Sequence, residues 1–423
     1  MQARAAGGIG ADRRLAVAAL LAAGAVVSGA GAYGYQWLAA RTLGPAGLAP
    51  IALLWTMQYL IVAIVLFAVE AHLARAYATG VAPGAAHRHA ARWTLAAAVL
   101  PGAAAFLLRD RLFGGAPSLW LAVPTSALLY GAFVHGRGHL AGAGHTRRYA
   151  AATALEGLGR AGGAAMALTA GGAAVHFAAA LALAPLAAVP FLWPRRPHAG
   201  AAEHLPLMPP LRATVVANGM AHLLLAGGPL LLALAGRPSS EVALLFLTTS
   251  LARIPLVVAL NGLLPRLVVT VTRLRADGVQ AIMPRLAAGA AAGGALTALG
   301  VGAAAAALGP AVLPLVFGPE FTVQPAVAVA ATAGALLATS AFTAGAVLVG
   351  LGRERCQPLP WAAGLLAAAL LWVAPWGDAV ERAAATLPIG AFVALVGLTR
   401  VAVMPPDANA DSASGRGAPT VRH

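Results

Sequence analysis

Two arginines lie inside long apolar stretches of this sequence, where a charged side chain is costly. Arg253 stands beyond the middle of the apolar run 241–263, and a cation there costs roughly 2.5–3.5 kcal/mol on membrane-insertion scales. A guanidinium pairs in bidentate fashion with phosphate oxygens, so Arg253 is a candidate contact for a pyrophosphate or an acidic sugar. The alternative is a structural role, in which Arg253 donates hydrogen bonds to helix carbonyls near Pro255.

The second such arginine, Arg160, follows Glu156 by four residues. This spacing places the two side chains on one helical face, in the favourable order with the acid first. The pair either neutralises itself so that the helix can insert, or acts as a protonatable switch that frees Arg160 for a ligand. Another acid, Glu70, ends an apolar run just before His72 and Arg75, which indicates an interfacial ion pair, with a coupling-ion site as the alternative.

Three more polar residues, Arg41, Gln58 and Asn218, complete the candidate ligand-binding groups. Arg41 and Arg237 occupy equivalent positions near the predicted outer surface, where they either catch an anionic group or only extend to the interface. Gln58 and Asn218 lie within apolar runs and either contact ligand hydroxyl groups or form interhelical hydrogen bonds. The predicted binding set is Arg253, Arg160, Glu156, Arg41, Gln58 and Asn218.

The residue inventory excludes several kinds of chemistry. All 28 basic residues are arginine, and the lack of lysine excludes a Walker A phosphate loop and a Schiff-base enzyme. Cys356 is the only cysteine, so intrachain disulfides and cysteine-based zinc sites are excluded too. His135 and His139 have i, i+4 spacing, but no acid or cysteine lies close enough in sequence to complete a metal site. We therefore expect no catalytic residue, no metal and no cofactor.

The composition is that of an integral membrane protein. Hydrophobic residues make up 60% and charged residues 10% of the 423 residues, whereas soluble domains carry about 25% charged residues. Because a membrane-crossing helix takes about 20 residues, the apolar runs predict twelve spans and no sizeable soluble domain. The fifth run is diluted by glycine, so eleven spans are the alternative. The predicted spans are 15–38, 48–71, 92–108, 117–135, 149–171, 173–193, 211–235, 241–263, 284–308, 323–350, 358–376 and 379–402.

The distribution of arginine predicts the orientation. With the N-terminus in the cytoplasm, 21 arginines fall in cytoplasmic segments, 5 in outer loops and 2 within spans. This bias follows the positive-inside rule and predicts a multi-pass protein of the cell membrane with both termini cytoplasmic. The arginines between apolar runs thus indicate membrane topology. We expect them to contact anionic lipids and do not expect the protein to bind nucleic acid.

The chain divides into two halves of similar length. A proline-rich segment at 194–210 separates a first lobe at 1–193 from a second at 211–402, and a polar tail at 403–423 is expected to be disordered. Landmarks recur at an offset of about 200 residues, which is typical of an internal repeat. Since six spans separate the copies, the repeat is parallel, about an axis along the membrane normal. The recurring landmarks are Arg41 with Arg237, Leu112-Phe113-Gly114 with Val316-Phe317-Gly318, and Gly142–Arg147 with Gly350–Arg355.

Several motifs resemble the polysaccharide-biosynthesis flippases of the multidrug, oligosaccharidyl-lipid and polysaccharide exporter superfamily. The resemblance covers the chain from about Leu15 to Ala402 and consists of spaced Gly, Arg and Pro signals. These lie in Tyr35–Gly47, in Gly136, Gly142 and Gly144 with Glu156 and Arg160, in Ala252-Arg253-Ile254-Pro255, in Leu264-Pro265-Arg266 and in Phe317-Gly318-Pro319-Glu320-Phe321.

The resemblance implies an all-α membrane protein with about twelve helices in two six-helix lobes around a central cavity. It implies a flippase that exports a polyprenyl-pyrophosphate-linked oligosaccharide by alternating access, with glycosyltransferases or a polymerase of the same pathway as further partners. The sequence departs from lipid II flippases, which usually have fourteen spans, and from cation-coupled drug exporters, because its first span has no acid. A drug antiporter and a membrane enzyme of the same glycan pathway are the alternatives.

Reporter fusions test the predicted topology. Fusions after Arg148 and Arg196 should report the cytoplasm, and fusions at Gly114 and Pro238 should report the outside, because the arginine bias fixes each loop. An outside signal at Arg196 would contradict both the twelve-span topology and the parallel repeat.

Overall fold

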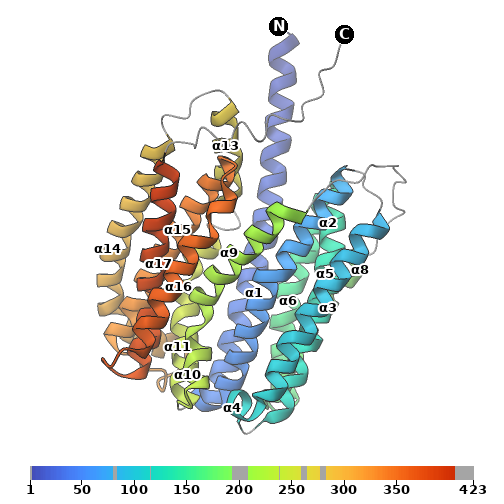
Figure 1. The fold of residues 1–423 in the computed structure, drawn as a ribbon. Helices are drawn as coiled ribbons and strands as arrows, with labels where there is room; N and C mark the ends of the chain where they lie inside the picture. The colour runs from blue at the N-terminus through green and yellow to red at the C-terminus, as the bar shows by residue number, and fades with distance from the viewer. Residues whose placement is uncertain are drawn as a thin grey trace.

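The computed structural model is built of helices packed side by side (Figure 1). It describes residues 2–79, 83–114, 116–192, 208–237, 239–258, 264–276 and 283–404, and no strand occurs within these ranges. The all-α fold class predicted from composition is therefore confirmed. Most of the predicted linker, 194–207, and nearly all of the predicted tail, 405–423, lie outside the described residues.

The first two predicted spans are the two arms of one kinked element. Helix α1 (Gln2–Ile61) has a break at Gly44, whose φ of 63° and ψ of 177° are not helical. Glycine adopts a positive φ without steric cost, and Pro45 at the start of the second arm suits a helix beginning. The second arm continues through the π-helical turn η1 (Val62–Leu66) into α2 (Phe67–Thr79).

The described part of each remaining predicted span is mainly helical. The first lobe is completed by α3 (Pro83–Leu107), α4 (Arg109–Phe113), η2 (Pro117–Leu121), α5 (Ala122–Gly142), α6 (Thr146–Thr169), α7 (Ala174–Leu183), η3 (Ala184–Ala188) and α8 (Val189–Leu192). The second lobe contains α9 (Met208–Ala226), α10 (Gly228–Leu234), α11 (Ser239–Ala252), α12 (Ile254–Val258), α13 (Leu264–Ala276), α14 (Met283–Phe317), α15 (Pro325–Gly350), η6 (Glu354–Cys356), α16 (Pro358–Val373) and α17 (Ala379–Val403).

Eight described helical segments are long and apolar enough to cross a membrane, and the bent pair α9 and α10 makes a ninth. One of the eight, Ala16–Ala78, is 63 residues long and holds both arms of the kinked element. The fifth predicted span is a full helix, α6, of 24 residues, although its glycines and charges lower its hydropathy. α11 is a shorter apolar helix of 14 residues.

The glycines that dilute the fifth span allow α6 to pack closely on α1. A methyl group added at Gly31 would lie 2.1 Å from the Gly157 carbonyl oxygen, and one added at Gly157 would lie 2.3 Å from the Ser28 Cα. Such contacts require small residues on both helices, as is usual where membrane helices associate. This packing holds Glu156, the residue before Gly157, against the first arm of α1.

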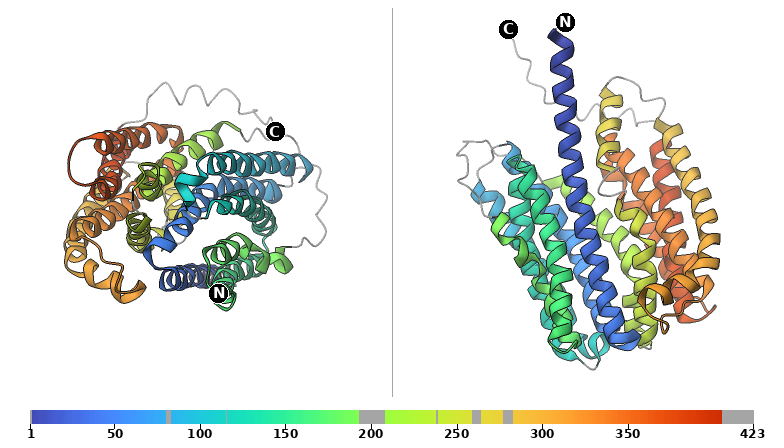
Figure 2. Two further views of the ribbon diagram at one scale, coloured as in Figure 1. Left: turned by 90° about the horizontal axis from the view of Figure 1, so that it is seen from below. Right: turned by 180° about the vertical axis from the view of Figure 1, so that it is seen from behind.

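The two lobes lie side by side, with the second arm of α1 between them (Figures 1 and 2). That arm packs on α11 and α9 of the second lobe. At the end opposite the start of α1, here called the distal end, α4 of the first lobe contacts α10 of the second. The lobes diverge toward the other end in the ribbon view (Figure 1). The exact bounds of the two lobes stay predictions, and α9 begins at Met208, inside the segment predicted as linker.

Candidate functional site

Two aromatic residues on α1 bring the two intramembrane arginines to neighbouring places. Trp55 and Tyr59 are four residues apart and so lie on one face of the helix, about 6 Å apart along its axis. The Arg160 Cζ, from α6 of the first lobe, lies 5.2 Å from the centroid of the Trp55 ring. The Arg253 Cζ, from the second lobe, lies 5.1 Å from the centroid of the Tyr59 ring. We call Trp55, Tyr59, Arg160 and Arg253 the arginine seam.

Arg253 is buried and its hydrogen bonding is incomplete. Its Nε donates to the Thr249 carbonyl over 3.0 Å, and its Nη2 donates to the Ser250 Oγ over 3.2 Å. Arg253 is only 8% exposed. Its Nη1 atom is buried and has no hydrogen-bond partner among the described residues. The structural alternative, hydrogen bonds to helix carbonyls, thus accounts for part of this side chain and leaves one nitrogen unsatisfied.

The helix break at Arg253 follows from Pro255. Proline has no N–H, so α11 ends at Ala252 and α12 begins at Ile254. Arg253 therefore projects from a discontinuity between two short helices. Discontinuous helices at membrane depth are tolerated where they line a cavity or are buried in protein.

The surroundings of Arg253 hold Tyr59 in place. The Tyr59 hydroxyl and the His222 Nδ1 are 2.9 Å apart, within hydrogen-bond distance. On the first arm of α1, the Tyr33 hydroxyl donates to the Ser250 carbonyl over 3.0 Å. Asn218 is half-buried on α9 and lies one turn before His222, on the same face. The second-lobe side of the seam thus combines a guanidinium with aromatic and uncharged polar groups.

Arg160, by contrast, has a counterion. Its Nη2 lies 2.5 Å from the Glu156 Oε1, and its Nε donates to the Tyr130 hydroxyl over 3.0 Å. The Tyr130 hydroxyl donates to the Glu156 Oε1, and the Ser28 hydroxyl donates to Oε2 over 3.2 Å. The i, i+4 pair predicted from sequence is therefore formed, and both Glu156 oxygens have partners.

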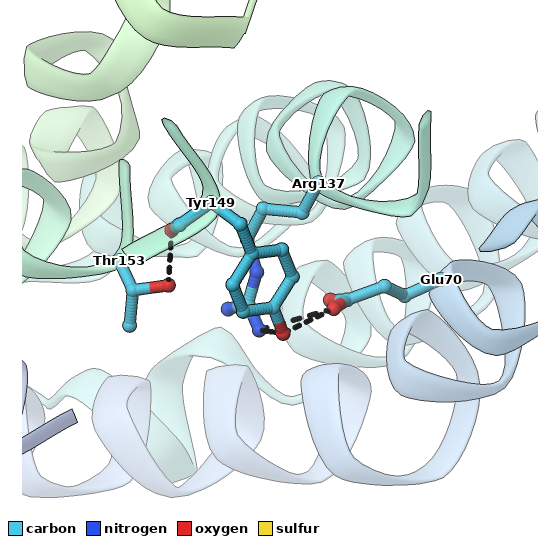
Figure 3. Close-up of polar contacts among 4 residues, drawn as sticks. All are labelled: Glu70, Arg137, Tyr149 and Thr153. Carbon is cyan, nitrogen blue, oxygen red and sulfur yellow. Dashed lines mark hydrogen bonds and ion pairs between the residues drawn. The ribbon is translucent and has the colours of Figure 1, made fainter. Parts of the chain in front are cut away.

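A second acid and base, both half-buried, meet nearby in the first lobe (Figure 3). The Arg137 Nη2 lies 3.0 Å from the Glu70 Oε1, and the Tyr149 hydroxyl donates to the same oxygen over 2.8 Å. Arg137 also donates to the Tyr149 hydroxyl. The sequence suggested an ion pair for Glu70 with the basic residues that follow it, and did not identify Arg137 as its partner. Arg137 was assigned to a loop after residue 135, whereas α5 continues to Gly142.

The predicted binding residues Arg41 and Gln58, and Arg237 as the predicted counterpart of Arg41, lie in different settings. Arg41 donates to two carbonyls of α14, from Nε to Val316 over 3.1 Å and from Nη2 to Leu315 over 2.8 Å. Arg237 makes a bidentate pair with Glu241, with distances of 2.9 and 2.8 Å. Gln58 is buried on α1, and its Oε1 has no hydrogen-bond partner among the described residues.

Several histidines gather on the first lobe. The rings of His87 and His135 stack with centroids 5.9 Å apart, and the Tyr77 hydroxyl is 2.5 Å from the His87 Nε2. Within the part of the chain that the structure describes, no group of three or more His, Cys, Asp or Glu side chains is arranged to hold a metal ion. His87 and His135 thus form a ring contact with each other and hydrogen bonds to Tyr77 and the Gly131 carbonyl.

Sequence reasoning missed the aromatic partners of the seam. Two aromatic residues at i, i+4, Trp55 and Tyr59, were a usable signal, because this spacing gives one face of a helix. Tyr130 and Arg137 on α5 are spaced by seven residues, as are Tyr149 and Glu156 on α6, which also indicates a shared face. These spacings place the polar groups on one face of α5 and one face of α6. They do not show that these two faces contact each other.

The contribution of the Glu156–Arg160 pair to stability can be measured with variants. Replacing Glu156 with Gln leaves a buried guanidinium without its counterion, and should cost about 3–5 kcal/mol of the free energy of unfolding in detergent. The double variant Glu156→Gln/Arg160→Gln should recover most of that loss, because no unpaired charge remains. Glu241→Gln, which breaks the exposed pair with Arg237, is the control and should have no measurable effect. If the double variant is as unstable as Glu156→Gln alone, the stabilising effect of Glu156 does not come from neutralising Arg160.

Comparison with solved structures identifies the fold. No protein-family model and no curated protein matches the sequence. An inward-facing multidrug resistance MATE family transporter of the MOP superfamily matches with a TM-score of 0.61 at 16% identity, over 88% of this chain and 94% of that one. A MATE protein in the bent conformation gives 0.61 at 16% identity, over 92% and 94%. A MOP superfamily transporter from Pyrococcus furiosus, whose binding pocket is described as reversed in polarity, gives 0.59 at 15% identity, over 91% and 95%. The chain therefore has the fold of the MATE transporters of the MOP superfamily.

Proposed function

We propose that this protein is a flippase that moves a polyprenyl-pyrophosphate-linked oligosaccharide across the cytoplasmic membrane by alternating access. The observation that carries the proposal is the unsatisfied, buried Nη1 of Arg253 at the seam between the lobes. A buried polar group without a partner is rare and costly, and marks a place where a ligand can supply the missing interaction. The fold supports transport, because solved structures of this fold include transporters.

Charge favours an anionic ligand at the arginine seam. Arg160 is balanced by Glu156, whereas no ion pair to Arg253 is found among the described residues. The seam and Glu156 together therefore carry one positive charge in excess. A guanidinium binds phosphate oxygens through planar, charge-assisted hydrogen bonds, which suit a pyrophosphate better than a neutral or cationic drug.

Uncharged polar groups near the seam suit the sugar part of the ligand. Gln58 lies between the seam residues Trp55 and Tyr59 in the sequence of α1 and has an unsatisfied Oε1, and Asn218 shares a face of α9 with His222. Amide side chains both donate and accept hydrogen bonds, as recognition of sugar hydroxyls requires. The polyprenyl tail needs no special site, because an apolar chain is soluble in the surrounding bilayer.

The position of the seam links ligand binding to lobe movement. Arg160 belongs to the first lobe, and Arg253 to the second, so rocking of one lobe against the other changes their separation. A ligand bound by both arginines would favour the conformation that brings them together. Release follows when the lobes separate them. The lobes would move as the rigid groups of the alternating-access mechanism described for transporters with internal repeats.

The setting of the proposed function follows from the sequence. Both termini and the 194–210 linker would lie in the cytoplasm, and membrane lipids would surround the bundle. Glycosyltransferases or a polymerase of the same pathway would act before or after the transport step. A cation-coupled drug antiporter is the second candidate, because neighbours of the same fold include a multidrug resistance transporter. The excess positive charge of the seam argues against cationic drugs as cargo.

Ligand binding by the purified protein tests this proposal. In phosphatidylcholine nanodiscs, we expect undecaprenyl pyrophosphate to bind and the neutral alcohol undecaprenol to bind far more weakly. Arg253→Ala should weaken pyrophosphate binding about 10- to 100-fold, since hydrogen bonds to charged groups contribute about 1.5–3 kcal/mol. The Arg253→Lys protein should bind the pyrophosphate with an affinity between those of the unchanged protein and of Arg253→Ala, because lysine keeps the charge and loses the planar guanidinium.

The matched control is Arg109→Ala, which removes an exposed arginine bound to the Phe106 carbonyl of its own lobe. It should bind the pyrophosphate normally. Equal binding of undecaprenol, or normal binding by a monodisperse Arg253→Ala protein, would contradict the proposal. Cation-driven efflux of a cationic dye from proteoliposomes, without pyrophosphate binding, would favour the antiporter.

A further inference from the structure

One arginine bridges the two lobes at the distal end. Arg41 lies on the first arm of α1, three residues before the kink at Gly44, and its side chain is exposed. It donates to the Leu315 carbonyl over 2.8 Å and to the Val316 carbonyl over 3.1 Å. Both acceptors lie at the C-terminal end of α14, in the second lobe. These two hydrogen bonds therefore connect the lobes directly.

The C-terminal end of α14 has carbonyl groups that are available to accept these hydrogen bonds from Arg41. In a continuing helix the Leu315 carbonyl would accept from the residue four positions on, but that residue is Pro319, which has no N–H. The regular helical bonding extends only to the preceding carbonyl, that of Pro314, which accepts from the Gly318 N–H over 3.0 Å. The last carbonyls of a helix also carry the negative end of its dipole, which favours a cation. Arg41 thus supplies both the missing donor and the favourable charge.

The internal repeat provides a counterpart that is not engaged. Arg237 corresponds to Arg41, and the Leu112-Phe113-Gly114 end of α4 corresponds to the Val316-Phe317-Gly318 end of α14. In the structure Arg237 and this α4 end line one cavity of about 260 Å³ between the lobes. Arg237 is held by the bidentate pair with Glu241 of its own lobe. One of two equivalent bridges is therefore formed, and the other is open over a cavity.

We propose that Arg41 is a latch that holds the distal ends of the two lobes together. The latch closes the distal end by a contact between side chain and helix end, so it can break without repacking the apolar faces. Its release lets α4 and α10, which are in contact here, move apart. The proposal does not depend on what the protein transports, since it concerns only the equilibrium between closed and open distal ends.

Cysteine labelling measures this equilibrium. Val242 is 2% exposed and lines the cavity between the lobes, so a cysteine there reacts only while the distal end is open. In a Cys356→Ser background, Val242→Cys protein in nanodiscs is treated with a charged maleimide. Arg41→Ala should raise the labelling rate about five- to tenfold, the effect of losing two exposed hydrogen bonds from a charged donor. Arg41→Lys should give a smaller increase, because one ammonium replaces the fork.

Arg382→Ala is the matched control. Arg382 also donates to backbone carbonyls, of Trp376 and Gly377, but these belong to its own lobe. It should leave the labelling rate unchanged. An unchanged rate in monodisperse Arg41→Ala protein would overturn the latch. An equal increase in Arg41→Ala and Arg382→Ala would also overturn it, because it would show general loosening.

Discussion

The cost of burying a guanidinium shapes much of this structure. A membrane interior offers no water to solvate a cation, so each buried arginine needs hydrogen-bond acceptors, an anion or an aromatic face. Arg137 and Arg160 each have a carboxylate and a tyrosine hydroxyl. Arg253 has a carbonyl, a serine hydroxyl and the Tyr59 ring, and one nitrogen remains unsatisfied. The Arg137 Nε is unsatisfied as well, so what distinguishes Arg253 is that no carboxylate among the described residues pairs with it. This missing counterion, together with the unsatisfied Nη1, is the physical basis for a ligand site at the seam.

The two lobes of the same architecture therefore carry different chemistry. In the first lobe, two acid–base–tyrosine clusters lie along the facing surfaces of α5 and α6, and their charges balance. In the second lobe, the buried Arg253 next to the helix break at Pro255 has no carboxylate partner among the described residues and lies beside aromatic groups. The distal end is asymmetric too, since Arg41 reaches the opposite lobe whereas Arg237 stays within its own. Two arginines at positions that the sequence predicts to be equivalent thus have different partners, which are helix carbonyls for Arg41 and a carboxylate for Arg237.

The sequence predicted the features that depend on residues close together in the chain, namely the helices and one ion pair. Apolar runs gave the helices, including the glycine-rich α6, and the i, i+4 spacing of Glu156 and Arg160 gave their ion pair. Contacts between helices distant in sequence were not predictable in this way, among them Glu70 with Arg137 and Tyr59 with Arg253. The end of α5 was also misplaced, because Gly138 and Gly142 pack against the backbone of α2 and extend the helix beyond its apolar run. That extension carries Arg137 into contact with Glu70.

The central claim is that an anionic head group completes the hydrogen bonding of Arg253 between the lobes. An experimental structure of the protein with undecaprenyl pyrophosphate tests it most directly. We predict phosphate oxygens within hydrogen-bond distance, about 2.7–2.9 Å, of the Arg253 guanidinium, with the terminal phosphate, to which the sugar of the full substrate is attached, toward Gln58 and Asn218. A pyrophosphate bound elsewhere, with Arg253 still held only by Thr249 and Ser250, would contradict it.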